Sequence, residues 1–501
     1  MRLPTHWEPF LFLQISPIKI IQNILPRLKQ SYSLDVRALA LMRIAVGFVL
    51  LTDICIRSLS IKAFFTDEGV LPIEVLKQYN WSPNYFSLHA ISGDLWWQIL
   101  LFTINAVCIA LLIIGYRTRL FTFICWVFLT SLQNRNPFIL QGGDDMLRLL
   151  LFWAVFLPWG ERYTIQKKSS YATNYFGWAN IGYLLLPASV FFFSALLKTS
   201  PEWRIDGTAL YYALSLDQIR MPGGTLLYQF PSIMKALTYV VFYIELLAPI
   251  LLILPFVPTK VRLIGIISYL CLFIGIASTV YVGLFYIIGI TSLIGLLPSS
   301  LMDWFETNFY KNKTEYDGSV EDTNRTYIVA LIYTLKNYFI ILVISFCLMM
   351  NLGSVKKFPY ALDPAIVHYG KALRLEQNWG MFAPFILKDD GWFVYSALNF
   401  QYKYIDIKND RDTVIYTKPK YPVCEFESDR WRKFQENYTF NNNNYMRPFY
   451  CKYLLKKWNK EHPDKRILDL TIFFMKETSL PDYKTEPLVK TAVCNCSENN
   501  E

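Results

Sequence analysis

The chain has 501 residues, of which 53% are hydrophobic and 17% aromatic, and its mean hydropathy is +0.27. This composition excludes an ordinary soluble protein, because the apolar residues gather in runs that approach the length needed to cross a bilayer as helix. The net charge of +10 does not indicate nucleic-acid binding, since the basic residues lie mostly in short loops beside apolar runs.

The apolar runs predict an α-helical polytopic membrane protein, because backbone groups in lipid must be satisfied within their own segment. Residues 1–35 contain short apolar stretches broken by prolines, which favour a cytoplasmic or interfacial segment over a signal peptide. The transmembrane domain is expected over 36–350 with about nine spans: 36–56, 95–114, 120–132, 146–159, 178–197, 234–256, 263–279, 280–297 and 327–348.

Lysine and arginine in the short loops predict the orientation of these spans. The basic residues of the N-terminus and of the loops after spans two, four, six and eight all fall on one side if there are nine spans and the N-terminus is cytoplasmic. This arrangement places residues 64–72, the connection 134–145, Lys198 and everything after residue 350 on the outer side.

From residue 351 the composition becomes that of a soluble domain, and we expect a small extracytoplasmic α+β domain over 351–490. Alternating patterns predict strands at 391–407, 413–417 and 468–475, and helices at 429–436 and 446–460. Residues 491–501 are expected to be a disordered tail. Cys424 and Cys451 are candidates for a disulfide if this domain faces an oxidising space.

Charged side chains inside spans are expensive, and they are kept where they are paired or used. Arg43, Asp53, Arg148 and Glu245 lie inside expected spans, and Asp144 and Arg148 are spaced to pair along one helix face. One interpretation is structural ion pairs that hold the helices in register. The other is a functional site, for which Glu245 is the sharpest candidate because a lone mid-span carboxylate needs a proton or a partner.

Lys198 follows the fifth apolar run directly, so its ammonium is expected where hydrocarbon gives way to headgroups. Partial desolvation there lowers a lysine pKa towards a value useful for base catalysis. The alternative is a lysine that only reaches to the membrane interface. Histidine is scarce, no cysteine pattern has metal-ligand spacing, and no phosphate-binding loop occurs, so no metal site is expected.

Four stretches together resemble the horizontally transferred transmembrane domain (HTTM) family, the bacterial relatives of vitamin K-dependent γ-carboxylase. They are LALMRIAVGFVLLTD at 39–53 with FFTDEGVLP at 64–72; GGDDMLRLLLFWAVFLPWG at 142–160; FFFSALLKTSPEWRIDGTALYYAL at 191–214; and QNWGMFAPFILKDDGWFV at 377–394. The resemblance covers roughly residues 32–400. It implies an integral protein of the bacterial inner (cell) membrane with the C-terminal domain outside.

In the carboxylase, a lysine five residues before a tryptophan deprotonates reduced vitamin K, and Lys198 and Trp203 have that spacing. The resemblance therefore implies Lys198 as base, a reduced quinone (vitamin K or menaquinone) as cofactor, and a secreted peptide or protein as partner. Glu245, Arg148 and Asp144 are expected to support the base. Candidate substrate-binding residues are Trp203, Asp206, Arg43 and Asp53.

The chain departs from the carboxylase at one functional position. The carboxylase uses a histidine before its fourth span, whereas residues 132–147 contain none and have Asn134, Arg135 and Asn136. Two function classes therefore stay open: a quinone-dependent, carboxylase-like enzyme, and a non-catalytic membrane protein that binds a lipid or peptide partner in maturation, immunity or export. A transporter ranks last, because no inverted repeat with paired broken helices is seen.

Overall fold

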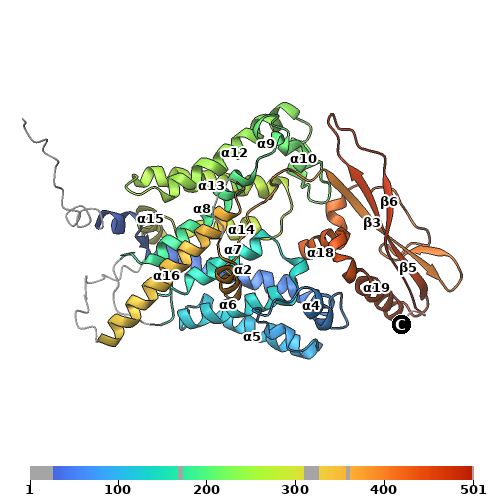
Figure 1. The fold of residues 1–501 in the computed structure, drawn as a ribbon, viewed down its shortest axis with the longest axis horizontal. Helices are drawn as coiled ribbons and strands as arrows, with labels where there is room; N and C mark the ends of the chain where they lie inside the picture. Colours follow the sequence, from blue (N-terminus) through green and yellow to red (C-terminus); the bar gives the residue numbers. More distant parts are fainter. Residues whose placement is uncertain (1–25, 167–172, 310–326, 357–361, 499–501) are drawn as a thin grey trace, which may run out of the picture.

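The computed structural model describes residues 26–166, 173–309, 327–356 and 362–498. The chain is mostly helical, with a bundle of long helices that ends, at one pole, against a four-stranded sheet (Figure 1). Most of the predicted interfacial segment lies outside the described residues. Its last part is helical at 26–31 and continues into a short strand, β1 (Leu34–Asp35), which pairs with β2 (Asn174–Tyr175).

Six helices are long and apolar enough to cross a membrane. The count becomes seven if the pair α14 (Phe285–Ile294) and α15 (Ser299–Phe309), which is bent by 93°, is one broken span. The six helices are α2 (Val36–Ser58), α5 (Leu95–Ile113), α8 (Trp178–Leu197), α12 (Pro231–Ile253), α13 (Thr259–Thr279) and α16 (Tyr327–Gly353).

Three expected spans fall on helices that do not meet this test alone: α6 (Thr118–Arg135), α7 (Gly142–Ala154) and α14. Helix α7 has 13 residues and α14 has 10, so each is shorter than a bilayer core. Both are interior elements, since α7 packs against α6, α8 and α14, and α14 packs against α2, α7 and α13. The prediction of nine spans therefore stays a prediction.

Short helices connect these elements near the two ends of the bundle. They are α3 (Ile61–Phe65), α4 (Ile73–Tyr79), η1 (Leu88–Ala90), η2 (Pro137–Ile139), α9 (Pro201–Arg204), α10 (Ala209–Ser215), α11 (Pro222–Leu227), α17 (Pro364–Ala372), η3 (Pro422–Glu425) and η4 (Asn441–Met446).

The segments predicted to share one side of the membrane do lie at one end of the bundle. The Phe64 ring is 4.4 Å from the Trp431 ring, and the Ser200 N–H donates to the Pro384 carbonyl at 3.2 Å. The Arg430 guanidinium contacts the Asp144 carboxylate at 2.5 Å. The C-terminal region thus covers the end of the bundle that carries 64–72, 134–145 and Lys198.

The C-terminal sheet is antiparallel, in the order β4-β3-β5-β6. Its strands are β3 (Asp389–Asn399), β4 (Tyr404–Asp406), β5 (Ile467–Thr478) and β6 (Val489–Ser497). Two helices, α18 (Asp429–Thr439) and α19 (Arg447–Glu461), lie beside it, and α19 packs against β5 and β6. The α+β composition predicted for this region is confirmed, as are both helices and the strand at 468–475.

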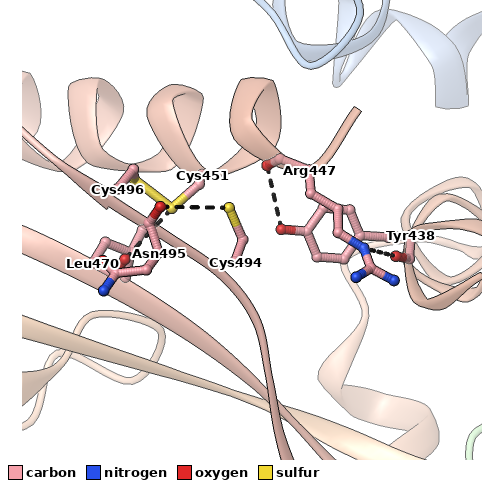
Figure 2. Close-up of a disulfide and its surroundings, with 7 residues drawn as sticks. All are labelled: Tyr438, Arg447, Cys451, Leu470, Cys494, Asn495 and Cys496. Carbon is pink, nitrogen blue, oxygen red and sulfur yellow. Dashed lines mark hydrogen bonds between the residues drawn. A yellow bond between two sulfur atoms is a disulfide. The ribbon is translucent and has the colours of Figure 1, made fainter. Parts of the chain in front are cut away.

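Several finer expectations for this region are wrong. The strand expected at 391–407 is a hairpin, because a turn at 400–403 separates β3 from β4, and no strand forms at 413–417. Most of the expected disordered tail is strand β6, which pairs along β5. The disulfide joins Cys451 to Cys496 (Figure 2). Cys424 is free and exposed. The pairing follows from the packing of β6 against α19, which brings the two Cα atoms to 6.1 Å.

Candidate functional site

Lys198 forms a buried ion pair with Glu245. The lysine caps the C-terminus of α8, where its N–H donates to the Ser194 carbonyl at 3.2 Å, and its exposed fraction is 2%. Glu245 lies in the middle of α12, which packs along α8, and is 5% exposed. The Lys198 Nζ donates to the Glu245 Oε2. The lone mid-span carboxylate therefore has a cation as its partner.

Trp203 closes this pair from the side of the C-terminal region. The Lys198 Nζ lies 4.3 Å from the centre of the Trp203 ring, a cation–π distance. The Trp203 Nε1 donates to the Phe382 carbonyl at 2.9 Å, so the indole is held by the segment 377–388. Two of the stretches that carry the family resemblance thus meet at Lys198.

Burial lowers the pKa of the Lys198 ammonium, and the Glu245 carboxylate opposes that shift. The loss of water also favours the competing state of such a pair, in which the proton moves to the carboxylate and leaves a neutral amine beside a neutral acid. A pair in that state can accept a proton at the amine. The arrangement is therefore suited to acid–base chemistry as well as to a structural role.

Asp53 and Asp144 lie in a separate four-charge cluster with Arg57 and Arg430. The Arg57 guanidinium contacts Asp53 at 2.8 Å and Asp144 at 2.6 Å. The Arg430 guanidinium contacts the same two carboxylates at 2.7 and 2.5 Å. All four residues are at least nine-tenths buried and their charges cancel. Because Arg430 belongs to α18, the cluster joins the C-terminal region to α2 and α7.

Arg148 is also engaged in joining segments. Its partner along the helix is Asp145 at 2.8 Å, not Asp144, so the expected pairing of Asp144 with Arg148 is wrong. The cause is that both Asp144 carboxylate oxygens are already engaged by the guanidinium groups of Arg57 and Arg430. The Arg148 Nε also donates to the Arg374 carbonyl at 2.8 Å, which fixes the chain that leads into 377–388.

The structure does not bring the remaining candidates to Lys198. Arg43 donates to the carbonyls of Trp159 at 3.2 Å and Arg162 at 3.3 Å, in the loop that follows α7. It therefore satisfies loop carbonyls at the end of α7 opposite Asp144, and its expected role in substrate binding stays a prediction. Asp206 is exposed and stands before Gly207, whose φ of +69° makes the turn after α9.

Two contributors were not anticipated from the sequence. Arg430 lies in an amphipathic helix whose charges are typical of a solvated face, so no signal marks it. The Phe382 carbonyl contributes a backbone atom, which any residue type supplies.

His89, outside the spans, is fully buried with its Nδ1 2.6 Å from the Ser131 Oγ, and burial lowers its pKa to about 3.

Within the described residues, no group of three or more His, Cys, Asp or Glu side chains is arranged to hold a metal ion. Comparison of the chain with protein-family models, curated proteins and solved structures gives no match.

Proposed function

We propose that this chain is a multi-pass membrane enzyme in which the Lys198–Glu245 pair removes a proton from a weakly acidic substrate. The observation that carries the proposal is the pair itself, buried at the end of a candidate span and closed by Trp203 and the 377–388 segment. The pair is not needed to satisfy a helix end, and a charged pair in apolar surroundings is costly to keep. A use in chemistry explains its retention.

A reduced quinone is the substrate that fits this site best. Its hydroxyl groups are weak acids, its rings stack on aromatic faces, and it reaches the site from the membrane. In the resting pair the amine is protonated, and transfer of that proton to Glu245 leaves an amine that takes the quinol proton and yields a quinolate beside the ammonium. Glu245 then loses its proton to the medium, so one proton is released for each quinol that is deprotonated. The HTTM-like stretches at 191–214 and 377–394 support a carboxylase-like reaction on a secreted peptide or protein.

The proposed topology has nine spans, a cytoplasmic N-terminus and the C-terminal region outside a bacterial inner membrane. The Cys451–Cys496 disulfide supports this orientation, since disulfides persist in oxidising compartments. The arrangement of basic loops supports it independently. In this orientation the Lys198–Glu245 pair lies at the end of the bundle that faces the outer leaflet.

A non-catalytic protein that binds a lipid or peptide partner is the second candidate. The four-charge cluster favours this candidate. Two of the charged residues singled out in the sequence, Asp53 and Asp144, serve there to attach the C-terminal region to the bundle. The candidate is also favoured by the absence of histidine from 132–147. In this case the Lys198–Glu245 pair is structural.

Binding of reduced menaquinone to the detergent-solubilised protein distinguishes the two. We expect saturable binding by the wild type with proton release into a weakly buffered medium, and loss of the proton release in Lys198→Ala and Glu245→Gln. Lys235→Ala, which removes an exposed lysine from the same helix as Glu245, is the matched control and should behave as wild type. Absence of binding by the wild type would contradict the quinone enzyme and leave the binding protein.

A further inference from the structure

A cavity of 750 Å³ lies at the end of the bundle opposite the C-terminal sheet, near α15 (Figure 1). It is enclosed by the helical turn 26–31, by the turn between α12 and α13, and by the bend between α14 and α15. Two candidate spans meet at the turn between α12 and α13, so the cavity lies at the depth where a bilayer core gives way to headgroups. The residues of the Lys198 site lie at the other end of the bundle and do not line this cavity.

The rim of the cavity is positively charged. Arg27 and Arg262 line it, and Arg262 is fixed there because its guanidinium donates to the Ser31 carbonyl at 2.7 Å. Asp35 is the one acidic residue among the described lining residues, and it forms an ion pair of 2.7 Å with Arg37. Arg37 also pairs with Asp303 and Glu306 of α15, which do not line the cavity. The rim therefore offers two cationic groups to a negatively charged ligand.

Two helices begin in the wall of the same cavity. Thr259 is the first residue of α13, and Ser299 is the first residue of α15. The first N–H groups of a helix have no partner within the helix, and the helix dipole adds partial positive charge there. Both effects add to the two arginines and favour an anion, above all a phosphate with several acceptor oxygens.

The floor of the cavity is apolar. Leu184, Leu263, Ile266 and Leu296 line it, from α8, α13 and the connection between α14 and α15. A free phosphate ion would occupy the rim and leave these side chains uncovered. A ligand with a phosphate at one end and a hydrocarbon chain at the other covers both parts, and basic pockets between membrane helices are recognised sites for such lipids.

We propose that this cavity binds a phospholipid with an anionic headgroup, whose phosphate lies between Arg27 and Arg262 and whose acyl chain enters between α8 and α13. The site is independent of the Lys198 chemistry. It would join the N-terminal turn to the α12–α13 turn, and so hold these two segments together at the membrane surface.

The test measures the thermal stability of delipidated protein in detergent after addition of phosphatidylglycerol, phosphatidylcholine or inorganic phosphate. We expect phosphatidylglycerol to raise the unfolding temperature saturably, and phosphatidylcholine and phosphate to have little effect. Each arginine near an anionic lipid contributes about 1 kcal/mol, so Arg27→Gln and Arg262→Gln should each weaken phosphatidylglycerol binding about fivefold.

Lys260→Gln is the matched control, because Lys260 is an exposed basic residue on the same turn that does not line the cavity. It should retain wild-type affinity. The Arg27 side chain is exposed. Arg27→Gln therefore tests the site while the hydrogen bond from Arg262 to the Ser31 carbonyl stays in place. Equal effects of the two lipids, equal affinity in all variants, or stabilisation by phosphate alone would each overturn the proposal.

Discussion

Lys198 and Glu245 stand 47 residues apart in the chain and share one hydrogen bond in the interior of the bundle. Each charge has lost its water, so each depends on the other for the stability of its ionised form. The pair is therefore a unit, and single substitutions act on both members. This coupling can be measured whether or not the pair has a catalytic role.

Lys198→Met should destabilise the protein by about 3–5 kcal/mol, because it leaves the Glu245 carboxylate buried without a cation. Glu245→Leu should cost a similar amount. The double variant should recover most of the loss, since no uncompensated charge remains. Unfolding rates of the four proteins at one temperature in the same detergent give the coupling. Additive losses would show that the pair does not act as a unit.

Asp390 predicts a dependence of stability on pH in the C-terminal region. Burial, together with the nearby Asp217 carboxylate, raises the pKa of Asp390 to about 6. The unfolded chain has an aspartate pKa of about 3.9, so between these values the folded state binds more protons than the unfolded state. The contribution of Asp390 is thus full below about pH 4 and is lost as the pH rises through about 6.

Asp390→Asn should remove this loss, because the amide oxygen still accepts the Asp217 N–H that the carboxylate accepts at 2.6 Å. The variant should gain stability relative to wild type by up to about 3 kcal/mol between pH 4 and pH 7. The measurement is the difference in unfolding temperature between the two proteins at a fixed scan rate across that range. A difference that does not change with pH would contradict the assignment.

At the scale of the elements, α18 is attached to the bundle through the four-charge cluster. Arg430→Gln removes one cation and leaves the Asp53 and Asp144 carboxylates with Arg57 alone. We expect hydrogen exchange in α18 to accelerate by about two orders of magnitude, as for the loss of about 3 kcal/mol from a buried pair.

Two further variants test the origin of that change. Arg430→Gln with Asp144→Asn restores neutrality and should regain much of the protection. Lys433→Gln, which removes a half-buried i,i+3 partner of Glu436 on the same helix, should change exchange by about twofold. If Lys433→Gln and Arg430→Gln had equal effects, the cluster would not be the attachment.

The elements also show what sequence patterns could predict. The six long apolar helices were predicted because hydrocarbon-facing runs need about 20 apolar residues. Helices α7 and α14 resemble spans in composition, but they are covered by neighbouring helices, and hydropathy does not distinguish burial in protein from burial in lipid. Strand β6 was missed since its polar, partly exposed sequence has no apolar alternation; its pairing with β5 forms it.

The sequence pattern predicted which residues belong to the candidate site, but it did not predict which of them contact one another. Lys198 and Glu245 were singled out because a charge at or inside a span needs a reason. That they meet depends on the packing of α8 against α12, which no local pattern contains. Asp53 and Asp144 were singled out by the same argument, and the structure assigns them instead to Arg430, whose own helix has the pattern of a surface helix.

On the scale of the whole molecule, the two ends of the bundle differ in kind. One end carries the C-terminal sheet (Figure 1). The Lys198–Glu245 pair and the four-charge cluster belong to this end, because Ser200 and Trp203 contact 382–384 and Arg430 comes from α18. The other end carries the cavity lined by Arg27 and Arg262. If the C-terminal end faces outwards, the proposed base and the proposed lipid site lie in opposite leaflets, so a quinol and an anionic lipid do not compete for one place.

This orientation predicts the reactivity of Cys424, which is free and exposed in the C-terminal region. A membrane-impermeant maleimide should label Cys424 in intact bacterial cells that express the chain, and permeabilisation should add little. Cys55 and Cys271 are exposed on candidate spans and should not react, because a thiol surrounded by hydrocarbon is not ionised. Cys424→Ser should abolish the fast labelling and leave only slow reaction at Cys494, which is free but partly buried in the same region. Cys451 and Cys496 should react only after reduction and unfolding. Labelling that appears only in permeabilised cells would place the sheet in the cytoplasm, and with it the Lys198 site.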